Sequence, residues 1–266
     1  MGIVNVTPDS FSDGGRIEDV HAAVALGRRL AAEGAAVLDV GGESTRPGAR
    51  PVPADEELER VLPVVRALVE RVGLPVSIDT RKAEVFVEAW RAGASMLNDV
   101  SGLTHDPELA GAVAETEAAL VLMHMRGTPE TMVSEAVYED PTRDVARELA
   151  RRRDAALEAG VPLERIILDP GIGFAKTTEQ NLALLKDPDP LRLPEGHALL
   201  VGPSRKRFLG EITGVSDPRG RDVSTAMVCG WLAARGVEMV RVHAVGASRE
   251  AIAAAEALAA RSPSWI

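Results

Sequence analysis

Short apolar runs alternate with longer amphipathic segments along the whole chain. Eight of these runs predict β-strands, at residues 2–6, 36–40, 75–78, 95–97, 119–123, 166–168, 198–201 and 239–242. The runs are rich in aliphatic residues and do not alternate strictly between apolar and polar positions. This pattern is typical of parallel strands that are buried on both faces.

The segments between the strands carry apolar residues at helical spacing. Val20, Val24 and Leu30 share one face of a helix that should end near Gly34, and similar spacing recurs after most strands. Alternating strands and helices build a parallel sheet, and eight such units predict a closed (β/α)8 (TIM) barrel of the α/β class. We expect residues 1–266 to form one such domain. An open doubly wound sheet is the alternative fold.

Composition narrows the possible functions. The chain has 266 residues and a formal net charge of -10, so binding to nucleic acid is not expected. Its one cysteine, Cys229, cannot form an internal disulfide, which fits a reducing compartment. No apolar run reaches the roughly 20 residues that span a bilayer, and no signal peptide is visible. We therefore expect a cytoplasmic protein with no membrane partner.

In a barrel, function lies on the loops that follow the carboxyl ends of the strands. Residues 7–15 form a polar loop that contains Phe11, and residues 41–48 combine glycines and hydroxyls with Arg46. A plain turn-rich connection is the alternative for both loops. An aromatic residue at a polar loop tip favours a ligand instead, and a glycine-rich loop with an arginine suits an anion.

Polar residues also follow the later strands. Asp79, Asn98 and Asp169 supply two carboxylates and an amide that can read a ring bearing N–H donors. An aspartate at such a position can also act only as a helix N-cap. Met123 could form an apolar wall for a flat ligand. We interpret His124, which stands alone, as a packed structural histidine.

Basic residues gather at the end of the chain. Arg241 and His243 point to the same side of their strand. With Arg46 and Lys206 they would form a positive pocket that suits phosphate or pyrophosphate. The sequence has no cluster with zinc-ligand spacing, no Ser-His-Asp arrangement, no phosphate-binding loop of the Walker type and no dinucleotide fingerprint.

Five segments resemble, in the right order, the motifs of the dihydropteroate synthases. MGIVNVTPDSFSDGG at 1–15 resembles the first signature, and residues 41–48, preceded by Asp39, resemble the second. DPGIGF at 169–174, SRK at 204–206 and RVH at 241–243 match further motifs. The resemblance covers essentially the whole chain, although relatives usually carry a segment upstream of the first signature.

The resemblance implies a single pterin-binding TIM-barrel domain over residues 1–266. It also implies that the amine of p-aminobenzoate displaces pyrophosphate from 6-hydroxymethyl-7,8-dihydropterin pyrophosphate, in folate biosynthesis. A Mg²⁺ cofactor, a homodimer and sensitivity to sulfonamides are further expectations. The leaving pyrophosphate gathers negative charge, so cations there would lower the barrier. An aromatic amine is already nucleophilic near neutral pH, so no strong base is required.

By resemblance, the site residues fall into four overlapping groups. The pterin would be bound by Asp79, Asn98, Met123, Asp169, Phe174, Lys206 and Arg241. Pyrophosphate would be held by Asn5, Arg46, Arg241 and His243, with Mg²⁺ on Asn5. p-Aminobenzoate would be bordered by Phe11, Thr45, Pro47, Ser204 and Lys206. The candidate catalytic residues are Asp13, Lys206, Arg241 and His243.

Two positions depart from the family pattern. Ala175 stands where glycine is common, and Ala244 stands where an aspartate usually follows the histidine. Two alternative functions stay open. A methyltetrahydrofolate:corrinoid methyltransferase would share the pterin pocket but lack the long first loop, the SRK segment and the Arg241/His243 anion site. A barrel that only binds a ligand would show no turnover.

Overall fold

The computed structural model describes residues 1–6, 16–45 and 48–259. Its sheet has eight parallel strands paired in sequence order. The strands are β1 Gly2–Asn5, β2 Leu38–Gly41, β3 Val76–Asp79, β4 Met96–Asp99, β5 Ala119–Met123, β6 Ile166–Asp169, β7 Ala198–Val201 and β8 Met239–Val240. Each strand lies where an apolar run predicted one, and the ends differ by two residues or fewer.

The sheet closes on itself between the two ends of the chain. Gly2 pairs with Val242, immediately beyond β8. The backbone N of Ile3 donates to the carbonyl of Val242 at 3.0 Å, and the N of Val242 donates to the carbonyl of Met1 at 3.0 Å. The predicted (β/α)8 barrel is therefore confirmed, and the open doubly wound alternative is wrong.

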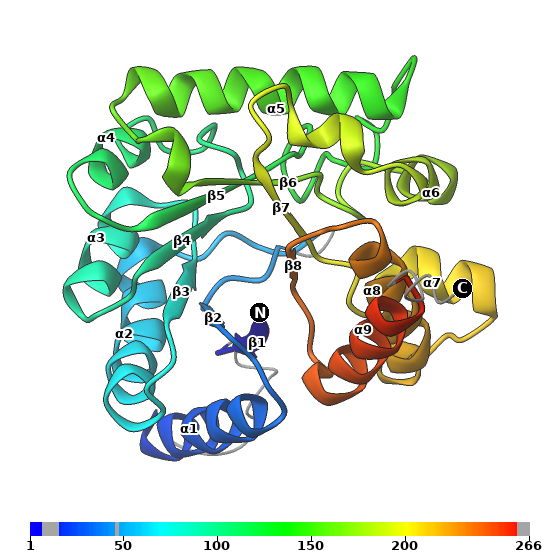
Figure 1. Ribbon diagram of the computed structural model, residues 1–266. Helices are drawn as coiled ribbons and strands as arrows, with labels where there is room; N and C mark the ends of the chain where they lie inside the picture. Colours follow the sequence, from blue (N-terminus) through cyan, green and yellow to red (C-terminus); the bar gives the residue numbers. More distant parts are fainter. Residues whose placement is uncertain (7–15, 46–47, 260–266) are drawn as a thin grey trace, which may run out of the picture.

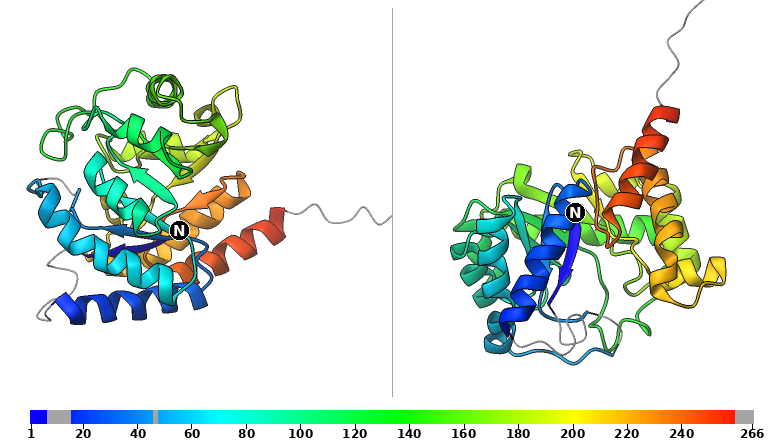
Figure 2. Two further views of the ribbon diagram at one scale, coloured as in Figure 1. Left: turned by 90° about the vertical axis from the view of Figure 1, so that its left-hand side faces the viewer. Right: turned by 90° about the horizontal axis from the view of Figure 1, so that it is seen from below.

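Helices form the outer layer around the strands, as Figures 1 and 2 show from three directions. In the described ranges they are α1 Arg16–Ala32, α2 Ala54–Arg71, α3 Ala83–Arg91, α4 Leu109–Ala114, α5 Pro141–Glu158, α6 Thr178–Lys186, α7 Arg207–Thr213, α8 Asp222–Ala234 and α9 Val245–Ala259. Short 3-10 turns are η1 Leu163–Arg165, η2 Asp189–Arg192 and η3 Pro218–Arg221. Among these residues, no helix is long and apolar enough to cross a bilayer.

The two faces of the strands have different partners. Val4, Val40 and Ile78 lie side by side on neighbouring strands and belong to the large core between the strands and the helices. A smaller cluster fills the barrel interior, with Met96, Val121 and Leu200 among its buried members. Successive side chains of a strand point to opposite faces of the sheet. At the carboxyl ends of the strands, beyond this apolar cluster, the inward-facing positions carry polar side chains.

Candidate active site

An arginine held between two carboxylates forms the centre of the barrel mouth. The Nε of Arg241 donates to Asp39 Oδ2 at 2.5 Å, and a terminal nitrogen donates to Asp79 Oδ2 at 2.8 Å. Asn98 Nδ2 donates to the same oxygen of Asp39 at 3.1 Å. The register brings these groups together, because Asp79 and Asn98 pair across β3 and β4 while Asp39 lies on β2.

The protonation of this centre follows from its burial. Burial raises the pKa of Asp79 to about 7, with Arg241 opposing the shift and Asp39 adding to it. Burial also lowers the pKa of Arg241, but the two carboxylates outweigh this effect and raise it above its ordinary value. The guanidinium therefore stays charged, whereas Asp79 can take up a proton near neutral pH.

Asp39 is a site residue to which sequence reasoning gave no role. Its side chain is fully buried and contacts two residues that were assigned, Arg241 and Asn98. The available signal was an aspartate near the end of an apolar strand, the same signal that drew attention to Asp79. The family resemblance assigned Asp79 to the pterin but marked Asp39 only as a residue that precedes the second signature.

Asp169 ends β6 and is 4% exposed. Its Oδ1 accepts a hydrogen bond from the backbone N of Gly171 at 2.7 Å. Burial raises the pKa of Asp169 to about 6, against the Gly171 N–H and the positive charge of Lys206. This carboxylate is mostly ionised at pH 7, so it can accept N–H donors from a ring.

Lys206 and Phe174 form a flat, positively charged wall beside Asp169. The Nζ of Lys206 lies 4.0 Å from the centroid of the Phe174 ring. A side chain at Gly173 would meet Lys206 Cδ at 2.9 Å, so the lysine stem packs on that glycine. Met123 pairs with Asp169 in the sheet and belongs to an apolar cluster against which Phe174 packs. These residues suit a flat heterocycle.

Ser204 and His243 join the loops that follow β7 and β8. Ser204 Oγ lies 2.8 Å from His243 Nδ1, and the backbone N of His243 donates to Ser204 Oγ at 3.1 Å. Arg205 has a φ of 57° and is fixed by hydrogen bonds of 2.7 and 2.8 Å to Asp222. The contact with Ser204 orients His243, whose next residue is Ala244 rather than an aspartate.

The remaining predicted residues are placed only in part. Asn5 is half-buried at the end of β1, and Thr45 is half-buried in the loop after β2. Four predicted residues lie outside the described part of the chain, namely Phe11, Asp13, Arg46 and Pro47. The structure therefore brings together the candidates from β3 to the loops after β7 and β8.

Glu43 holds the first part of the loop after β2, within the residues that the structure describes. Its Oε1 accepts from the backbone N of Val52 at 3.0 Å and lies 3.1 Å from an Arg81 nitrogen. Its Oε2 accepts from Lys82 Nζ at 3.0 Å, and the same lysine also contacts the buried Glu57 at 2.5 Å. These contacts fix the base of the segment that carries Thr45.

Protein oxygen ligands for a metal are sparse at this mouth. Among the residues that the structure describes, no group of three His, Cys, Asp or Glu side chains could hold an ion. The side chain of Asn5 at the end of β1 offers one amide oxygen. Mg²⁺ commonly binds through one or two protein oxygens, with water and substrate phosphates completing its octahedron. The residues present therefore fit a substrate-bound Mg²⁺ rather than a metal enclosed by the protein.

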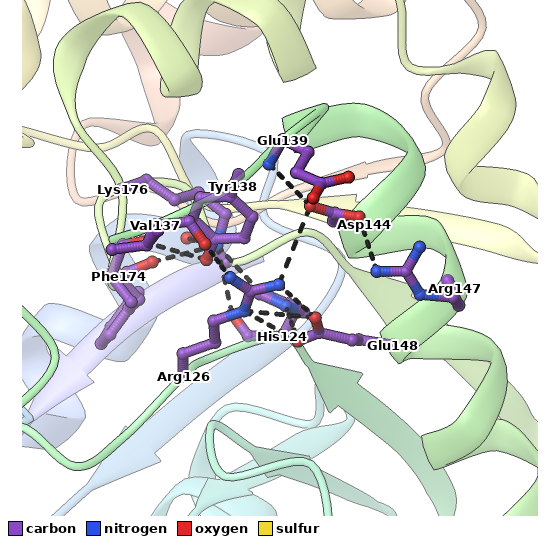
Figure 3. A network of polar contacts seen from close by, with 12 residues as sticks. His124, Arg126, Val137, Tyr138, Glu139, Asp144, Arg147, Glu148, Phe174 and Lys176 are labelled. Carbon is purple, nitrogen blue, oxygen red and sulfur yellow. Dashed lines mark hydrogen bonds and ion pairs between the residues drawn. The ribbon is translucent and has the colours of Figure 1, made fainter. Parts of the chain in front are cut away.

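A second polar network lies behind the mouth (Figure 3). His124 is 2% exposed, and its Nε2 lies 2.9 Å from Glu148 Oε2 on α5. Arg126 also pairs with Glu148, and its guanidinium stacks 4.0 Å from the centroid of Tyr138. Burial lowers the pKa of His124 to about 4, so the ring is neutral at pH 7. The interpretation of His124 as a packed structural residue agrees with these contacts.

Comparison with known proteins gives one consistent result. Residues 1–243 match the family described as pterin binding enzyme. The dihydropteroate synthase of Synechocystis sp. is 46% identical over 259 residues, covering 97% of this chain and 89% of that protein. The Xanthomonas albilineans dihydropteroate synthase with 4-aminobenzoic acid has a TM-score of 0.91 at 46% identity, covering 98% of this chain and 93% of that one. The same enzyme in complex with 7,8-dihydropteroate has a TM-score of 0.88 at 44% identity, with 98% and 93% covered.

Proposed function

The chain belongs to the dihydropteroate synthases of the pterin-binding enzyme family, and we propose how its residues divide the work of that reaction. The enzyme condenses 6-hydroxymethyl-7,8-dihydropterin pyrophosphate with p-aminobenzoate, which gives 7,8-dihydropteroate and pyrophosphate. The observation that carries the residue assignment is the grouping of Asp169, Lys206 and Phe174 at one wall of the barrel mouth. It combines an acceptor for ring N–H groups with a flat surface.

The pterin is proposed to lie between this wall and the Arg241 centre. Asp169 accepts the N–H donors of the pyrimidine edge, and Asp79 and Asn98 read the rest of the ring. Phe174 and Met123 cover its faces, and Lys206 hydrogen bonds to the ring. As the C–O bond to pyrophosphate breaks, the pterin methylene becomes electron-poor and the ring delocalises that charge, which the negative charge of Asp169 stabilises.

The pyrophosphate is proposed to lie above Arg241. A guanidinium has five N–H donors, so Arg241 can keep its two carboxylate partners and still face an anion. His243 reaches the same side from two residues further along the chain, and Arg46 would approach from the loop after β2. Positive groups that surround the leaving oxygen stabilise the charge that develops as the C–O bond breaks.

Mg²⁺ is proposed to bind the pyrophosphate beside Asn5, whose amide oxygen is the one protein ligand assigned to it. When bound, the ion neutralises charge on the leaving group. The chain's own contribution is to place Asn5 at the end of β1, on the same rim of the barrel as Arg241.

p-Aminobenzoate is proposed to enter last, bordered by Thr45, Ser204 and Lys206 and by Phe11 and Pro47. Its amine attacks the pterin methylene without a strong base, because an aromatic amine carries a lone pair at neutral pH. The first loop is proposed to close over the mouth with Asp13, which would exclude water and protect the electron-poor pterin from hydrolysis.

A homodimer is proposed from an apolar stripe on α8. Val223, Met227 and Trp231 follow one another at intervals of four residues and are 74%, 72% and 45% exposed. Exposed apolar stripes of this kind commonly mark interfaces, and a second copy of the chain is the proposed occupant. Sedimentation should detect a dimer that Met227→Glu dissociates, whereas Val133→Glu, at another exposed apolar position, should leave it intact.

The reaction is tested by release of pyrophosphate. Release should require both substrates together, and dihydropteroate should accumulate in equal amount. Methyl transfer to a corrinoid, or ligand binding without turnover, would contradict the proposed reaction.

We expect the enzyme to act in the cytoplasm, because its one cysteine, Cys229, is buried and unpaired.

A further inference from the structure

Lys176 lies just beyond the Asp169 loop and bonds back to it (Figure 3). Its Nζ donates to the carbonyl of Gly171 at 3.1 Å and to the carbonyl of Phe174 at 3.0 Å. The third close partner is His124 Nδ1 at 3.0 Å, at the end of the neighbouring strand. Three acceptors match the three N–H donors of an ammonium group, whereas a neutral amine has only two.

The acceptor on the histidine is fixed from its other side. His124 is neutral, and its Nε2 lies 2.9 Å from the Glu148 carboxylate, so the Nε2–H tautomer satisfies both neighbours. Glu148 is in turn bonded to Arg126. The lysine is therefore attached to α5 through a chain of hydrogen bonds, and its position does not depend on the loop alone.

The Asp169 loop leaves no room for a side chain at Gly171 and passes through residues of positive φ. Gly171 has a φ of 67°, and a Cβ there would lie 1.9 Å from the carbonyl oxygen of His124. Ala175 has a φ of 48°, and its carbonyl accepts from Tyr138 Oη at 3.0 Å. This strained backbone needs hydrogen bonds to keep it, and Lys176 supplies two of them.

We propose that Lys176 is a positioning residue that sets the geometry of the pterin-binding loop through the carbonyls of Gly171 and Phe174. The peptide N–H of Gly171 orients the Asp169 carboxylate, and Phe174 carries the ring beneath Lys206. Lys176 itself touches neither of these side chains in the contacts described. The inference rests on the proposed pterin site and adds a residue to which the family motifs assigned no role here.

The charged groups around Lys176 make its effect depend on pH. Burial lowers the pKa of Lys176 to about 7, while Asp169 and Glu148 raise it and Lys206 and Arg126 lower it. The other titratable groups that face it are His124, which is neutral, and Tyr138, whose pKa burial raises to about 12. As pH rises through 7, the amine loses one of its three donors, so the loop loses a hydrogen bond.

The test compares Lys176→Met with Lys186→Met, which makes the same chemical change at an exposed position at the end of α6. Pterin affinity is measured by calorimetry and stability by thermal melting. Lys176→Met should bind the pterin at least about tenfold more weakly, as expected when a site is displaced by a fraction of an ångström. Its melting temperature should fall, because the carbonyls of Gly171 and Phe174 and the Nδ1 of His124 lose their donor, and the binding measurement is therefore made below the melting transition of the variant.

Further readouts separate positioning from a purely structural role. The KM for p-aminobenzoate should change much less than pterin affinity, and the wild-type decline of pterin affinity above pH 7 should disappear in Lys176→Met. If that variant does not fold, Lys176→Gln, which keeps amide donors, must still weaken pterin binding. If either folded variant binds the pterin as tightly as wild type does, the inference about Lys176 is wrong, and the proposed pterin site is unaffected. A wild-type enzyme that binds no pterin would overturn the pterin site together with that inference.

Discussion

Arg241 and Asp79 form a 2.8 Å ion pair across the barrel mouth, although 162 residues separate them in the chain. One belongs to the proposed pyrophosphate site and the other to the proposed pterin site. Asp39 completes the arrangement by holding the Nε of the same guanidinium. The side chains proposed to recognise the two halves of one substrate thus also fix each other.

The first prediction concerns Asp39→Asn. Loss of this fully buried charge leaves Arg241 with one carboxylate, so the free energy of unfolding should fall by about 2–4 kcal/mol. Pyrophosphate release should fall as well, because the guanidinium loses its fixed position. Chemical denaturation and a release assay check both effects. Asp55→Asn, at an exposed position of α2, should change stability by less than about 0.5 kcal/mol. If Asp39→Asn had equally small effects on stability and on pyrophosphate release, Asp39 would have no role in the site.

The second prediction concerns Asp169→Asn. The change replaces an anionic acceptor of ring N–H groups with a neutral amide, so pterin binding should weaken by roughly 2–4 kcal/mol. Calorimetry with a pterin ligand measures the difference. A change below about 0.5 kcal/mol, within the scatter of surface substitutions, would contradict the assigned role.

The third prediction concerns pH. The folded pKa of Asp169 is raised to about 6, so the carboxylate that binds the pterin is lost below that pH. Below this pKa, pterin affinity should fall by up to about tenfold per pH unit, whereas between the pKa and pH 7 the Asp169 carboxylate should change it little. The same raised pKa makes protonation of this group favour the folded state, so acidification does not weaken binding through Asp169 by unfolding the protein. Calorimetry between pH 5 and pH 8 should show the decline in wild type and a flatter profile in Asp169→Asn.

The fourth prediction concerns Mg²⁺. Chelation with EDTA should suppress pyrophosphate release, and excess Mg²⁺ should restore it, because the ion neutralises the leaving group. Binding of a pterin without pyrophosphate should be unaffected, since Asn5 is assigned to the pyrophosphate site. An unchanged rate in EDTA would count against the metal assignment.

The fifth prediction concerns the order of binding. Arg46 is assigned to pyrophosphate and stands between Thr45 and Pro47, which are assigned to p-aminobenzoate. An anion that fixes Arg46 should therefore fix its neighbours too. p-Aminobenzoate, or a sulfonamide, should bind at least about tenfold, or roughly 1.4 kcal/mol, more tightly when pterin and pyrophosphate are present. Arg46→Ala should abolish the difference, and equal affinity in both conditions with wild type would defeat the idea.

The strands were predictable because strands buried on both faces remain apolar along their length. β5 and β7 coincide with the predicted runs, and even the short run at 95–97 overlaps β4, with ends that differ by one and two residues. The loop after β7 was less predictable: it contains α7, η3 and α8 before β8 begins. The helical spacing of apolar residues does not by itself reveal where one helix ends and the next begins.

The sequence predicted the site residues that belong to a family motif. It did not predict the residues whose role depends on contacts that only the fold creates. Asp169, Phe174 and Lys206 were expected to share a ligand, and the structure places them together. Asp39 was missed because its partners, Asn98 and Arg241, lie on other strands, and Lys176 was given no role because no motif assigned one to it. Which strand-end residues face each other depends on the register of the closed sheet, and a single sequence does not encode that register in any local pattern.

The pairing of Ile3 with Val242 also determines when the barrel can close during biosynthesis. Strand β1 is translated before the other seven strands, but its second neighbour, β8, is the last of them. Strands β2 to β7 can pair as they appear, while β1 retains an open edge. Loop closure over such a separation is entropically costly and slow. Asn5 and Arg241 lie at the two sides of that last seam, so the proposed anion site would be completed only at the end of folding.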